Sequence, residues 1–552
     1  MRQLVVIGNG MVGHRLVEAL CERDTGRTWA VTVLGEEPRP AYDRVALSSY
    51  FDGATEADLR LADLTGDGRV VLCLGERATA VDRQARTVTT SGGRRIGYDT
   101  LVLATGSVPF VPPVPGRDLP GCHVYRTIDD LEGITADARS ARCGVVVGGG
   151  LLGLEAARAL QLLGLRAHVV ERAPWLMPRQ VDEGGGALLG RLVAETGVVV
   201  HTGAVVEAVE AGADGRVARV RLGGGEVVDA DLVVFSVGVR PRDELARGCG
   251  LELGPRGGVA VDEACRTSDP CIYAVGECAS VGGEVYGLVA PGNAMAEVVA
   301  DRLVGGRAVF AGADTSTRLK LLGVDVASFG DALGGGEGVV DVVVNDAPGR
   351  RYARLVVSDD ARTLLGGVLV GDVSAYAALR PVVGRELPAD PLALVWPVEG
   401  AGARAGVLPE DAQVCSCHAV TKGRVLRAVA EEGARDVAAL KSCTRAGTGC
   451  GSCVPMLKRL LDEAGVAQSR ALCEHFGQSR AELVQIVMAT GIATFSELIG
   501  RYGTGRGCDV CKPAVASILA SLRGGHVLEG EQAALQDTND HFLANLQRNG
   551  TY

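Results

Sequence analysis

The hydrophobic positions of the N-terminal half form short runs, separated by glycine-rich turns and by apolar residues at helical spacing. Residues 4–7 and 31–34 are two such runs, and the helical pattern between them extends to Leu20. The order returns further along the chain, with largely apolar runs at residues 145–147 and 167–170. Short apolar runs of this length are typical of buried strands. The pattern therefore predicts two α/β domains.

The hydrophobic pattern changes in the C-terminal part of the chain. Residues 339–344 and 364–370 are short apolar strands among turns, which predicts a small α+β domain over residues 312–400. A Gly/Ala-rich stretch at residues 400–409 has the composition of a linker. Beyond it, the residues that follow Pro455 have the spacing of an amphipathic helix. We therefore expect small helical modules at the C-terminal end.

Each α/β domain has a glycine turn between its first strand and its first helix. The six glycines are Gly8, Gly10, Gly13, Gly148, Gly150 and Gly153. Glycine at these positions lets the backbone approach a pyrophosphate at the N-terminus of a helix. An acid follows the second strand of each domain, Glu36 in the first and Glu171 in the second, where it would accept hydrogen bonds from a ribose. Two complete motifs in one chain predict two dinucleotide sites.

Half of the 16 cysteines are gathered in the C-terminal quarter of the chain. Cys415 and Cys417 form a Cys-x-Cys pair, and 32 residues separate it from the Cys-x2-Cys pair of Cys450 and Cys453. Thiolate sulfur is a soft, anionic ligand, so four such groups suit an iron–sulfur cluster or zinc. A helix beginning at Pro455 would aim free backbone amides at this centre and stabilise its negative charge.

The cysteine pattern recurs 58 residues further along, as Cys473, His475, Cys508 and Cys511. A histidine therefore takes the place of the second cysteine. Glycines and apolar positions keep the same offset, which indicates a tandem repeat of one small module. Imidazole replaces thiolate in some clusters, so the second set either binds a cluster or belongs to a degenerate module that serves packing or docking.

Composition and charge limit the partners. The net charge is −11 and no basic run stands out, so nucleic acid is not expected to bind. No apolar stretch reaches the length of a membrane span, and the first strand begins within three residues of Met1, which leaves no room for a signal peptide. Numerous scattered cysteines suit a reducing compartment. We therefore expect a cytoplasmic protein that makes no membrane contact.

Residues 103–106, 236–241 and 272–277, together with the glycine turns, resemble the two-dinucleotide-binding-domain flavoproteins. The resemblance implies two Rossmann-like domains, of which the first binds FAD and the second NAD(P)H. The further FAD-binding residues that it implies are Thr105, Gly106, Gly276 and Glu277. Glu277 stands where the family usually has aspartate, and either acid could hydrogen-bond the ribityl chain.

Residues 41–48 resemble the segment near the flavin in rubredoxin-reductase-like members, which implies a contact between Arg44 and FAD. An ordinary surface arginine is the alternative. The Glu171 carboxylate would repel a 2′-phosphate and favours NADH, while the neighbouring Arg172 keeps NADPH open. No cysteine occurs between Cys21 and Cys73, where disulfide reductases of this fold carry their redox pair. The reduced flavin must therefore discharge elsewhere.

The first cysteine set resembles that of bacterioferritin-associated ferredoxin domains, which implies a [2Fe-2S] cluster, with structural zinc as the alternative. The order of all parts resembles the N-terminal part of the large subunit of NADH-dependent assimilatory nitrite reductase. That family continues into sirohaem and [4Fe-4S] domains, but this chain has no cysteine after Cys511. The resemblance therefore implies that a partner polypeptide carries the sirohaem, with or without a small subunit, or that the chain is truncated.

The expected domains follow one another from the flavin to the cluster. Their boundaries are 1–112 and 243–311 for the FAD domain, 113–242 for the NAD(P)H domain, 312–400 for the small α+β domain, 411–465 for the [2Fe-2S] module, 469–525 for the variant module and 526–552 for a tail. FAD would take a hydride from NADH and release single electrons to the cluster. No catalytic acid, base or nucleophile is expected.

Three functions are compatible with these features. The chain is the NADH-oxidising part of a nitrite reductase that forms ammonia on a sirohaem partner, or the electron-transfer subunit of an assimilatory nitrate reductase. In the third interpretation it is a degenerate flavoprotein whose cysteine modules bind zinc and serve docking. An absorption spectrum separates the third function from the others, because zinc sites would add no cluster bands to those of the flavin.

Overall fold

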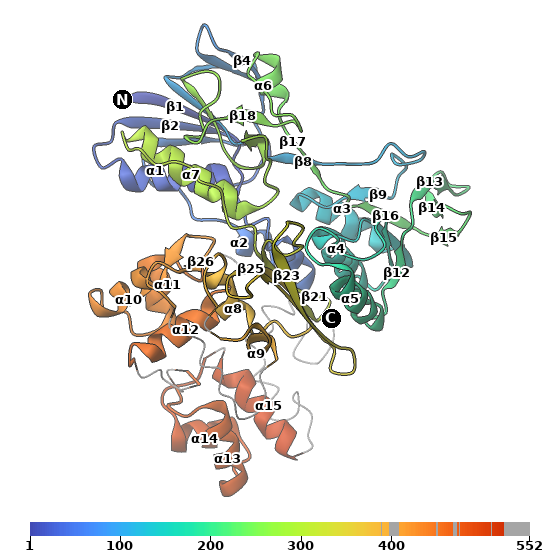
Figure 1. The fold of residues 1–552 in the computed structure, drawn as a ribbon, viewed down its shortest axis with the longest axis vertical. Helices are drawn as coiled ribbons and strands as arrows, with labels where there is room; N and C mark the ends of the chain where they lie inside the picture. Colours follow the sequence, from blue (N-terminus) through green and yellow to red (C-terminus); the bar gives the residue numbers. More distant parts are fainter. Residues whose placement is uncertain are drawn as a thin grey trace. The chain divides into compact units, whose positions relative to one another are not determined.

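A computed structural model describes residues 1–387, 389–396, 408–448, 451–466, 472–473, 475–508 and 510–523. The chain divides into two compact units, Met1–Leu460 and Leu461–Tyr552, and each has its own architecture. Figure 1 shows the fold coloured along the sequence. Most of the expected linker at residues 400–409, and all of the expected tail at 526–552, lie outside the described residues.

A parallel five-stranded sheet forms the core of the first α/β domain. Its order is β19-β7-β1-β2-β3, with β1 Arg2–Ile7, β2 Trp29–Leu34, β3 Val70–Cys73, β7 Thr100–Leu103 and β19 Ile272–Ala274. The last strand comes from a segment far along the chain and pairs with β7. Leu4, Val5 and Val6 are buried in succession, as the short apolar run predicts for a buried strand.

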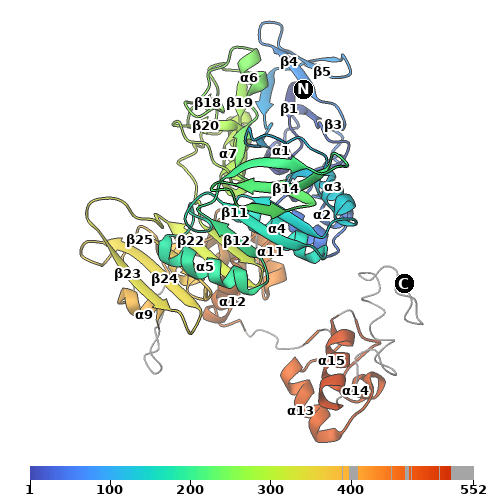
Figure 2. The same cartoon turned by 90° about the vertical axis from the view of Figure 1, so that its right-hand side faces the viewer.

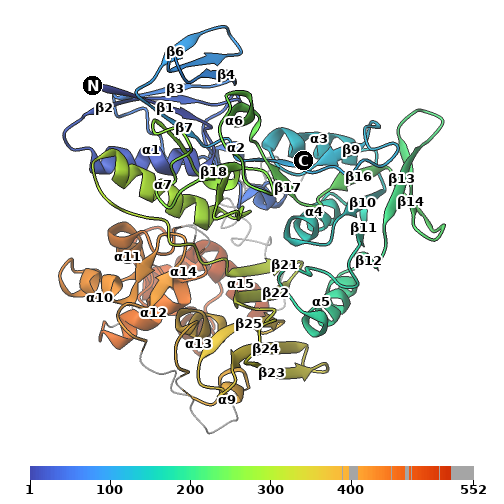
Figure 3. The ribbon, with the colours of Figure 1, turned by 45° about the horizontal axis from the view of Figure 1, so that its top comes forward.

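Helices α1 (Met11–Arg23) and α7 (Val289–Leu303) lie side by side on this sheet (Figures 1 and 3). The small elements of the domain are an antiparallel sheet of β4 Ala78–Asp82, β5 Thr87–Thr90 and β6 Arg95–Gly97, a strand pair of β18 Val259–Val261 and β20 Ala279–Val281, the helices α2 Glu56–Leu59 and α6 Glu244–Gly248, and the 3-10 helices Leu47–Asp52 and Gly276–Cys278.

The second α/β domain repeats the design with the parallel order β12-β11-β10-β16-β9. Its strands are β9 Cys122–Val124, β10 Cys143–Val147, β11 Arg166–Glu171, β12 Val199–Thr202 and β16 Leu232–Phe235, and its helices are α3 Ile128–Ala138, α4 Leu151–Leu162 and α5 Glu183–Glu195. An antiparallel sheet of β13 Val206–Ala211, β14 Val217–Leu222 and β15 Val227–Asp229 extends it. The chain enters and leaves this domain through the antiparallel pair β8 Ser107–Pro109 and β17 Val239–Pro241.

The predicted small domain is a five-stranded antiparallel sheet in the order β21-β22-β25-β24-β23. Its elements are β21 Thr317–Leu321, β22 Val324–Gly330, β23 Val339–Asp346, β24 Arg351–Ser358, β25 Leu364–Val370, α8 Tyr376–Leu379, the 3-10 helix Arg380–Val382 and α9 Pro391–Val395. Helix α5 crosses this sheet (Figure 2), and Tyr352 donates a hydrogen bond to Asp182 at the start of that helix. The small domain therefore shares a core with the second α/β domain.

The first cysteine module begins with a short hairpin and continues as helices. Its elements are β26 Gln413–Cys415, β27 Val420–Thr421, α10 Lys422–Ala430, α11 Val437–Thr444 and α12 Val454–Glu463. The helix predicted to follow Pro455 is confirmed as α12. Leu440 and Leu457 are fully buried, so apolar faces of α11 and α12 form the interior of the module.

The second compact unit contains the variant module, which folds as three helices, α13 Arg480–Thr490, α14 Phe495–Tyr502 and α15 Cys511–Arg523. Phe476, Leu483 and Leu498 are buried at its centre. Ser479 and Glu482 form a capping box at the start of α13, which satisfies backbone amides that the helix cannot pair. Among the described helices, none alone has the length and apolarity of a membrane span; α13 and α14 meet those criteria only as a pair bent by 107°. The expected α/β class with small helical modules is confirmed.

Candidate redox sites

The first glycine loop joins β1 to α1, and close backbone contacts give it its shape. A Cβ atom on Gly8 would lie 2.0 Å from the carbonyl oxygen of Ala104, and one on Gly13 would lie 2.1 Å from that of Gly8. Gly10 differs, because no atom of the described residues lies within 4 Å of the place its Cβ would take. It is the N-cap of α1, and it makes no side-chain hydrogen bond to the first amides of the helix. A pyrophosphate fits such a place.

The second glycine loop, between β10 and α4, repeats this geometry. A Cβ on Gly148 would lie 2.3 Å from the carbonyl oxygen of Ser236, and one on Gly153 would lie 1.9 Å from that of Gly148. Gly150 again has no atom within 4 Å of its absent Cβ, and it precedes α4 without a side-chain cap. The two loops therefore leave room at equivalent positions.

The two acids that follow the second strands have different surroundings. The Glu171 carboxylate accepts hydrogen bonds from the backbone N–H groups of Gly149 and Ala173, each at 2.7 Å, which holds it beside the second loop. Glu36 instead forms an ion pair with Arg242, with 2.6 Å between Oε2 and Nη1. Glu171 is thus held by backbone N–H groups at the second glycine loop, whereas Glu36 is held by the side chain of a residue that follows β17.

Thr105 and Gly106 lie where the chain crosses between the α/β domains. The Thr105 hydroxyl donates to the carbonyl oxygen of Arg242 at 2.7 Å, and the Arg242 N–H donates to that of Gly106 at 2.9 Å. Gly106 has a φ of +69°, which favours glycine. These bonds join the crossing point to the segment that holds Glu36.

Glu277 and Arg44 meet around Arg126, a residue that no sequence motif marks. Glu277 accepts a hydrogen bond from Ser107 at 2.7 Å and pairs with the Arg126 guanidinium. Arg44 donates to the Arg126 carbonyl oxygen at 3.0 Å and pairs with Glu37. Its side chain is 24 % exposed, so Arg44 is held in place by contacts and does not extend freely into solvent.

Three of the four cysteines of the first set converge, and Cys450 lies outside the described residues. Cys415 ends β26, and its thiol is within hydrogen-bonding reach of the thiols of Cys417 and Cys453, the latter directly before α12. The contact with Cys417 lowers the pKa of Cys415, but Cys453 and burial raise it on balance. The backbone thus brings sulfur ligands from two distant segments together.

The four residues of the second set also come together. Sulfur atoms of Cys473, Cys508 and Cys511 and a ring nitrogen of His475 all lie within 4.8 Å of one another. The backbone N–H of Cys508 donates to the Cys511 sulfur at 3.1 Å. Hydrogen bonds from backbone N–H groups, that of Cys511 first, lower the pKa of Cys508, whereas burial raises that of Cys511.

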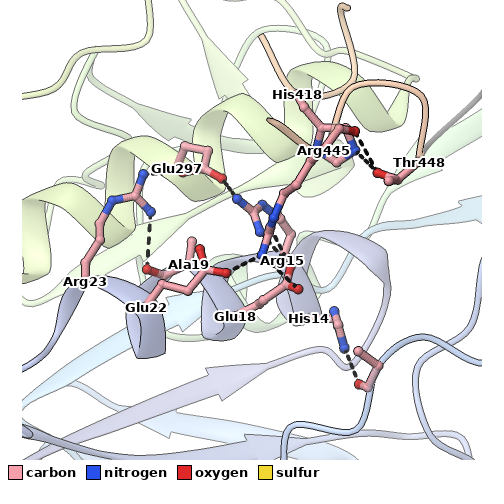
Figure 4. Close-up of polar contacts among 11 residues, drawn as sticks. His14, Arg15, Glu18, Ala19, Glu22, Arg23, Glu297, His418, Arg445 and Thr448 are labelled. Carbon is pink, nitrogen blue, oxygen red and sulfur yellow. Dashed lines mark hydrogen bonds and ion pairs between the residues drawn. The ribbon is translucent and has the colours of Figure 1, made fainter. Parts of the chain in front are cut away.

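A network of charged side chains covers the faces of α1 and α7 that lie next to the first module (Figure 4). Glu297 of α7 pairs with both Arg15 and Arg23 of α1. Arg15 also pairs with Glu18, with 2.6 Å between Nη1 and Oε2. The network joins α1, which follows the first glycine loop, to α7, which comes from a distant segment of the chain.

Arg445 of the first module extends this network. Its guanidinium lies 3.2 and 3.3 Å from the two carboxylate oxygens of Glu18 and also pairs with Glu22 (Figure 4). Arg445 is the C-cap of α11 and has a φ of +61°, a left-handed conformation that glycine adopts more easily. A long charged side chain is thus kept at a position whose backbone favours a residue without one.

Thr448 and His418 lie next to Arg445 in the module. The Thr448 hydroxyl is 2.8 Å from the Arg445 carbonyl oxygen and 2.9 Å from the His418 Nε2. Burial lowers the pKa of His418, and the Arg15 guanidinium adds to this effect. The ring is therefore neutral near pH 7 and adds no positive charge beside the arginines.

The module also contacts the small α+β domain. Arg385 forms two parallel hydrogen bonds with Asp411, at 3.0 and 2.9 Å. Ser416, between the first two cysteines, donates to Asp314 at 3.2 Å, and Arg380 donates to the same carboxylate at 2.6 Å. Burial alone would raise the pKa of Asp314, but the Arg380 guanidinium lowers it on balance. Polar contacts therefore hold the module on two sides.

Three known families match successive parts of the chain. Residues 2–297 match the pyridine nucleotide-disulphide oxidoreductases, residues 316–386 the C-terminal domain of rubredoxin NAD⁺ reductases, and residues 413–463 the BFD-like [2Fe-2S] binding domain. The chain thus combines an FAD- and NAD-binding redox part with a [2Fe-2S]-binding domain. The covalent putidaredoxin reductase–putidaredoxin complex has a similar fold, with a TM-score of 0.63 and 26 % identity over 71 % of this chain and 95 % of that one.

Similarity to curated proteins extends over essentially the whole chain. It is 47 % identical to the nitrite reductase (NADH) large subunit of Escherichia coli, over 100 % of this chain and 66 % of that one. It is 34 % identical to the nitrite reductase [NAD(P)H] of Bacillus subtilis, over 100 % of this chain and 69 % of the other. The assimilatory nitrate reductase electron transfer subunit of Bacillus subtilis is 30 % identical, over 95 and 69 % of the two chains.

The chain spans only part of its relatives, namely 66 % of the Escherichia coli protein and 52 to 58 % of three further nitrite reductases. Within that span lie the parts of the chain that match the three families, residues 2–297, 316–386 and 413–463. The chain therefore belongs to the family of NAD(P)H nitrite reductase large subunits, within the pyridine nucleotide-disulphide oxidoreductases.

Proposed function

We propose that this chain oxidises NADH and delivers single electrons through its [2Fe-2S] domain for the reduction of nitrite to ammonia by a sirohaem-containing partner polypeptide. The observation that carries this proposal is the contact of Arg445 with α1, the helix that begins at the first glycine loop. It ties the cluster domain to the helix that would receive the FAD pyrophosphate. A small subunit and a cytoplasmic location belong to the same proposal.

The first loop and its surroundings fit FAD. Gly8 and Gly13 fix the loop, and Gly10 leaves the space that a pyrophosphate would fill. Bound FAD supplies what no side chain can, the acceptance of a hydride and the release of single electrons. In this proposal Glu36, Thr105, Gly276 and the contacts that Arg44 and Glu277 make with Arg126 position the cofactor, so hydride transfer needs no side-chain acid or base.

The second loop fits NADH. Gly150 leaves room for the pyrophosphate, and Glu171 is held by two backbone N–H groups at the place where a ribose acceptor is needed. A carboxylate fixed there opposes a 2′-phosphate. The proposed domain boundaries are those expected from the sequence, with residues 113–242 as the NADH domain.

The first cysteine module fits a cluster bound by four thiolates, Cys415, Cys417, Cys450 and Cys453. The three described sulfurs converge at the start of α12, where free backbone amides favour negative charge. Electron tunnelling slows steeply with distance, so Arg445, Asp411 and Asp314 contribute by holding the module in place. Their own chemistry is limited to binding and positioning.

A second candidate function is supported by the nitrate reductase relative, of which the chain covers 69 %. In that case the same NADH oxidation would supply a nitrate-reducing partner. Reduction by the purified chain and NADH of a sirohaem protein, compared with that of a molybdenum protein, distinguishes the two. Turnover with the sirohaem protein supports the first function, and turnover only with the molybdenum protein supports the second.

Alanine at Gly10 or Gly150 should separate the two nucleotide sites. Neither Cβ would meet a protein atom within 4 Å, so the fold should persist, whereas each methyl group would occupy pyrophosphate space. Gly10→Ala should weaken FAD binding about tenfold, and Gly150→Ala should raise KM for NADH about tenfold with FAD retained. Flavin content and steady-state kinetics measure these effects. Gly190→Ala in α5, equally open, is the control, and unchanged binding in both loop variants would contradict the assignment.

Glutamine at position 171 should relax the choice of coenzyme. The substitution keeps an acceptor oxygen near the second loop but removes the charge that repels a 2′-phosphate. We expect the ratio of kcat/KM for NADH to that for NADPH to fall about tenfold in Glu171→Gln. Glu183→Gln, an exposed acid at the start of α5, is the control. A wild-type protein that already prefers NADPH would refute the role of Glu171.

Serine at Cys415 should separate NADH oxidation from electron delivery. The nucleotide loops are untouched, so NADH should still bleach the flavin at the wild-type rate. Reduction of a one-electron protein acceptor should fall at least about tenfold, because a cluster ligand is lost. Cys443→Ser, in the same module but outside the ligand pattern, should behave as wild type. Full delivery by an iron-depleted Cys415→Ser protein would remove the cluster from the path.

Alanine at Arg445 should slow electron delivery without loss of the cluster. Two partly exposed ion pairs worth about 0.5 kcal/mol each hold the module at this point, so delivery should fall roughly fivefold. The salt dependence of delivery should weaken too, because screening acts on the same pairs. Stopped-flow reduction of the cluster after NADH mixing measures both. Arg435→Ala, an exposed arginine in the same module, is the control; equal rates and salt dependence in both variants would show that Arg445 does not position the module.

A further inference from the structure

The second cysteine module has ligand geometry of its own. Cys473 and His475 lie on a turn before α13, with 3.8 Å between the Cys473 sulfur and the His475 Nδ1. Cys508 and Cys511 lie at the start of α15, and their sulfurs are also 3.8 Å apart. All four ligand atoms lie within 4.8 Å of one another, so the two pairs surround one small volume.

These distances match a single tetrahedral ion. Four ligands bound at zinc–sulfur and zinc–nitrogen bond lengths lie roughly 3.5–3.8 Å from one another along the edges of the tetrahedron. Each of the two ligand pairs, at 3.8 Å, has the separation expected when one ion binds both atoms. The four ligand atoms are close enough together for a single ion to bind all of them.

The histidine is built into the site by its surroundings. Its Nδ1 faces Cys473, and the other side of its ring packs against Gly505, whose Cβ would lie 3.0 Å from the His475 Cδ2. The Thr504 N–H donates to the His475 carbonyl oxygen at 2.8 Å. A side chain at position 505 would displace the ring. The loop of residues 503–505 thus fixes which nitrogen can be a ligand.

The sulfurs are also prepared as anionic ligands. The His475 N–H donates to the Cys473 sulfur at 3.4 Å, and the Cys508 N–H donates to the Cys511 sulfur at 3.1 Å. Backbone N–H groups directed at sulfur stabilise thiolate, the form in which cysteine binds a metal. One bond of this kind occurs in each ligand pair.

We propose that Cys473, His475, Cys508 and Cys511 bind one zinc ion, which makes the second module a structural domain that carries no electrons. Three cysteines and one histidine are a common structural zinc set, with every position taken by protein. The ion would join the turn before α13 to the start of α15, across a small core centred on Phe476 and Leu498. Domains of this size gain much of their stability from such a bond. The inference does not depend on the proposed nitrite reductase function.

Metal and sulfide analysis of the full chain tests this assignment. We expect one zinc, two irons and two acid-labile sulfides per polypeptide. Cys508→Ser should lose the zinc and keep both irons, and Cys415→Ser should lose the irons and keep the zinc. Four irons with four sulfides in the wild-type chain, a third iron without zinc, or loss of iron in Cys508→Ser would each overturn the proposal.

Cobalt provides a readout that does not require the variants to fold. The wild-type chain produced in cobalt-supplemented, zinc-depleted medium should show the visible d–d bands of tetrahedral cobalt bound to thiolates. Added zinc should remove these bands while NADH-dependent reduction of the first cluster stays unchanged. Absence of cobalt bands from a chain with an intact first cluster would contradict a mononuclear site. Failure of nitrite reduction alone would bear on the proposed function and not on this site.

Discussion

Both nucleotide loops depend on backbone contacts that only glycine permits. A Cβ at Gly13 or Gly153 would lie 2.1 or 1.9 Å from a carbonyl oxygen, far closer than a non-bonded contact allows. The helix that follows each loop can therefore start directly beside the strand that precedes it. Other features of the structure are placed relative to these loops. The acids Glu36 and Glu171 follow the second strand of each domain, and α1 carries the charges that the cluster module contacts.

The charged network on α1 joins the first α/β domain to the first cysteine module. Arg15, Arg23 and Glu297 join two segments of the FAD domain, and Glu18 and Glu22 add the module through Arg445. Arginines and glutamates alternate, so each charge has an opposite neighbour. Individual exposed pairs contribute little, whereas a network shares the cost of ordering its side chains. The module is thus attached by electrostatic contacts, supported on its other side by Asp411 and Asp314.

Sequence patterns predicted the features that depend on local spacing. Gly8, Gly10 and Gly13 are fixed by one turn, and the cysteine pairs by the geometry of one centre, so short intervals in the sequence record them. The strands β1, β10 and β25 were found because a buried strand leaves a short apolar run. The convergence of Cys473 with Cys508 followed from the repeat, while the separations of their ligand atoms required the structure.

Contacts between remote segments left no such trace. Arg126 meets Glu277 across 151 positions and Arg445 meets Glu18 across 427, and neither arginine belongs to a periodic pattern. Glu36 was expected to accept hydrogen bonds from a ribose, and no sequence pattern predicted its ion pair with Arg242. The left-handed backbone of Arg445 shows that this position is subject to two opposing structural requirements. A glycine there would relieve about 1 kcal/mol of backbone strain and would form a better helix C-cap. The local backbone therefore favours glycine, whereas the long-range ion pairs require arginine. The residue that a relative has at this position would therefore tell whether its ferredoxin-like domain is held against the flavin domain or moves between the electron donor and the electron acceptor.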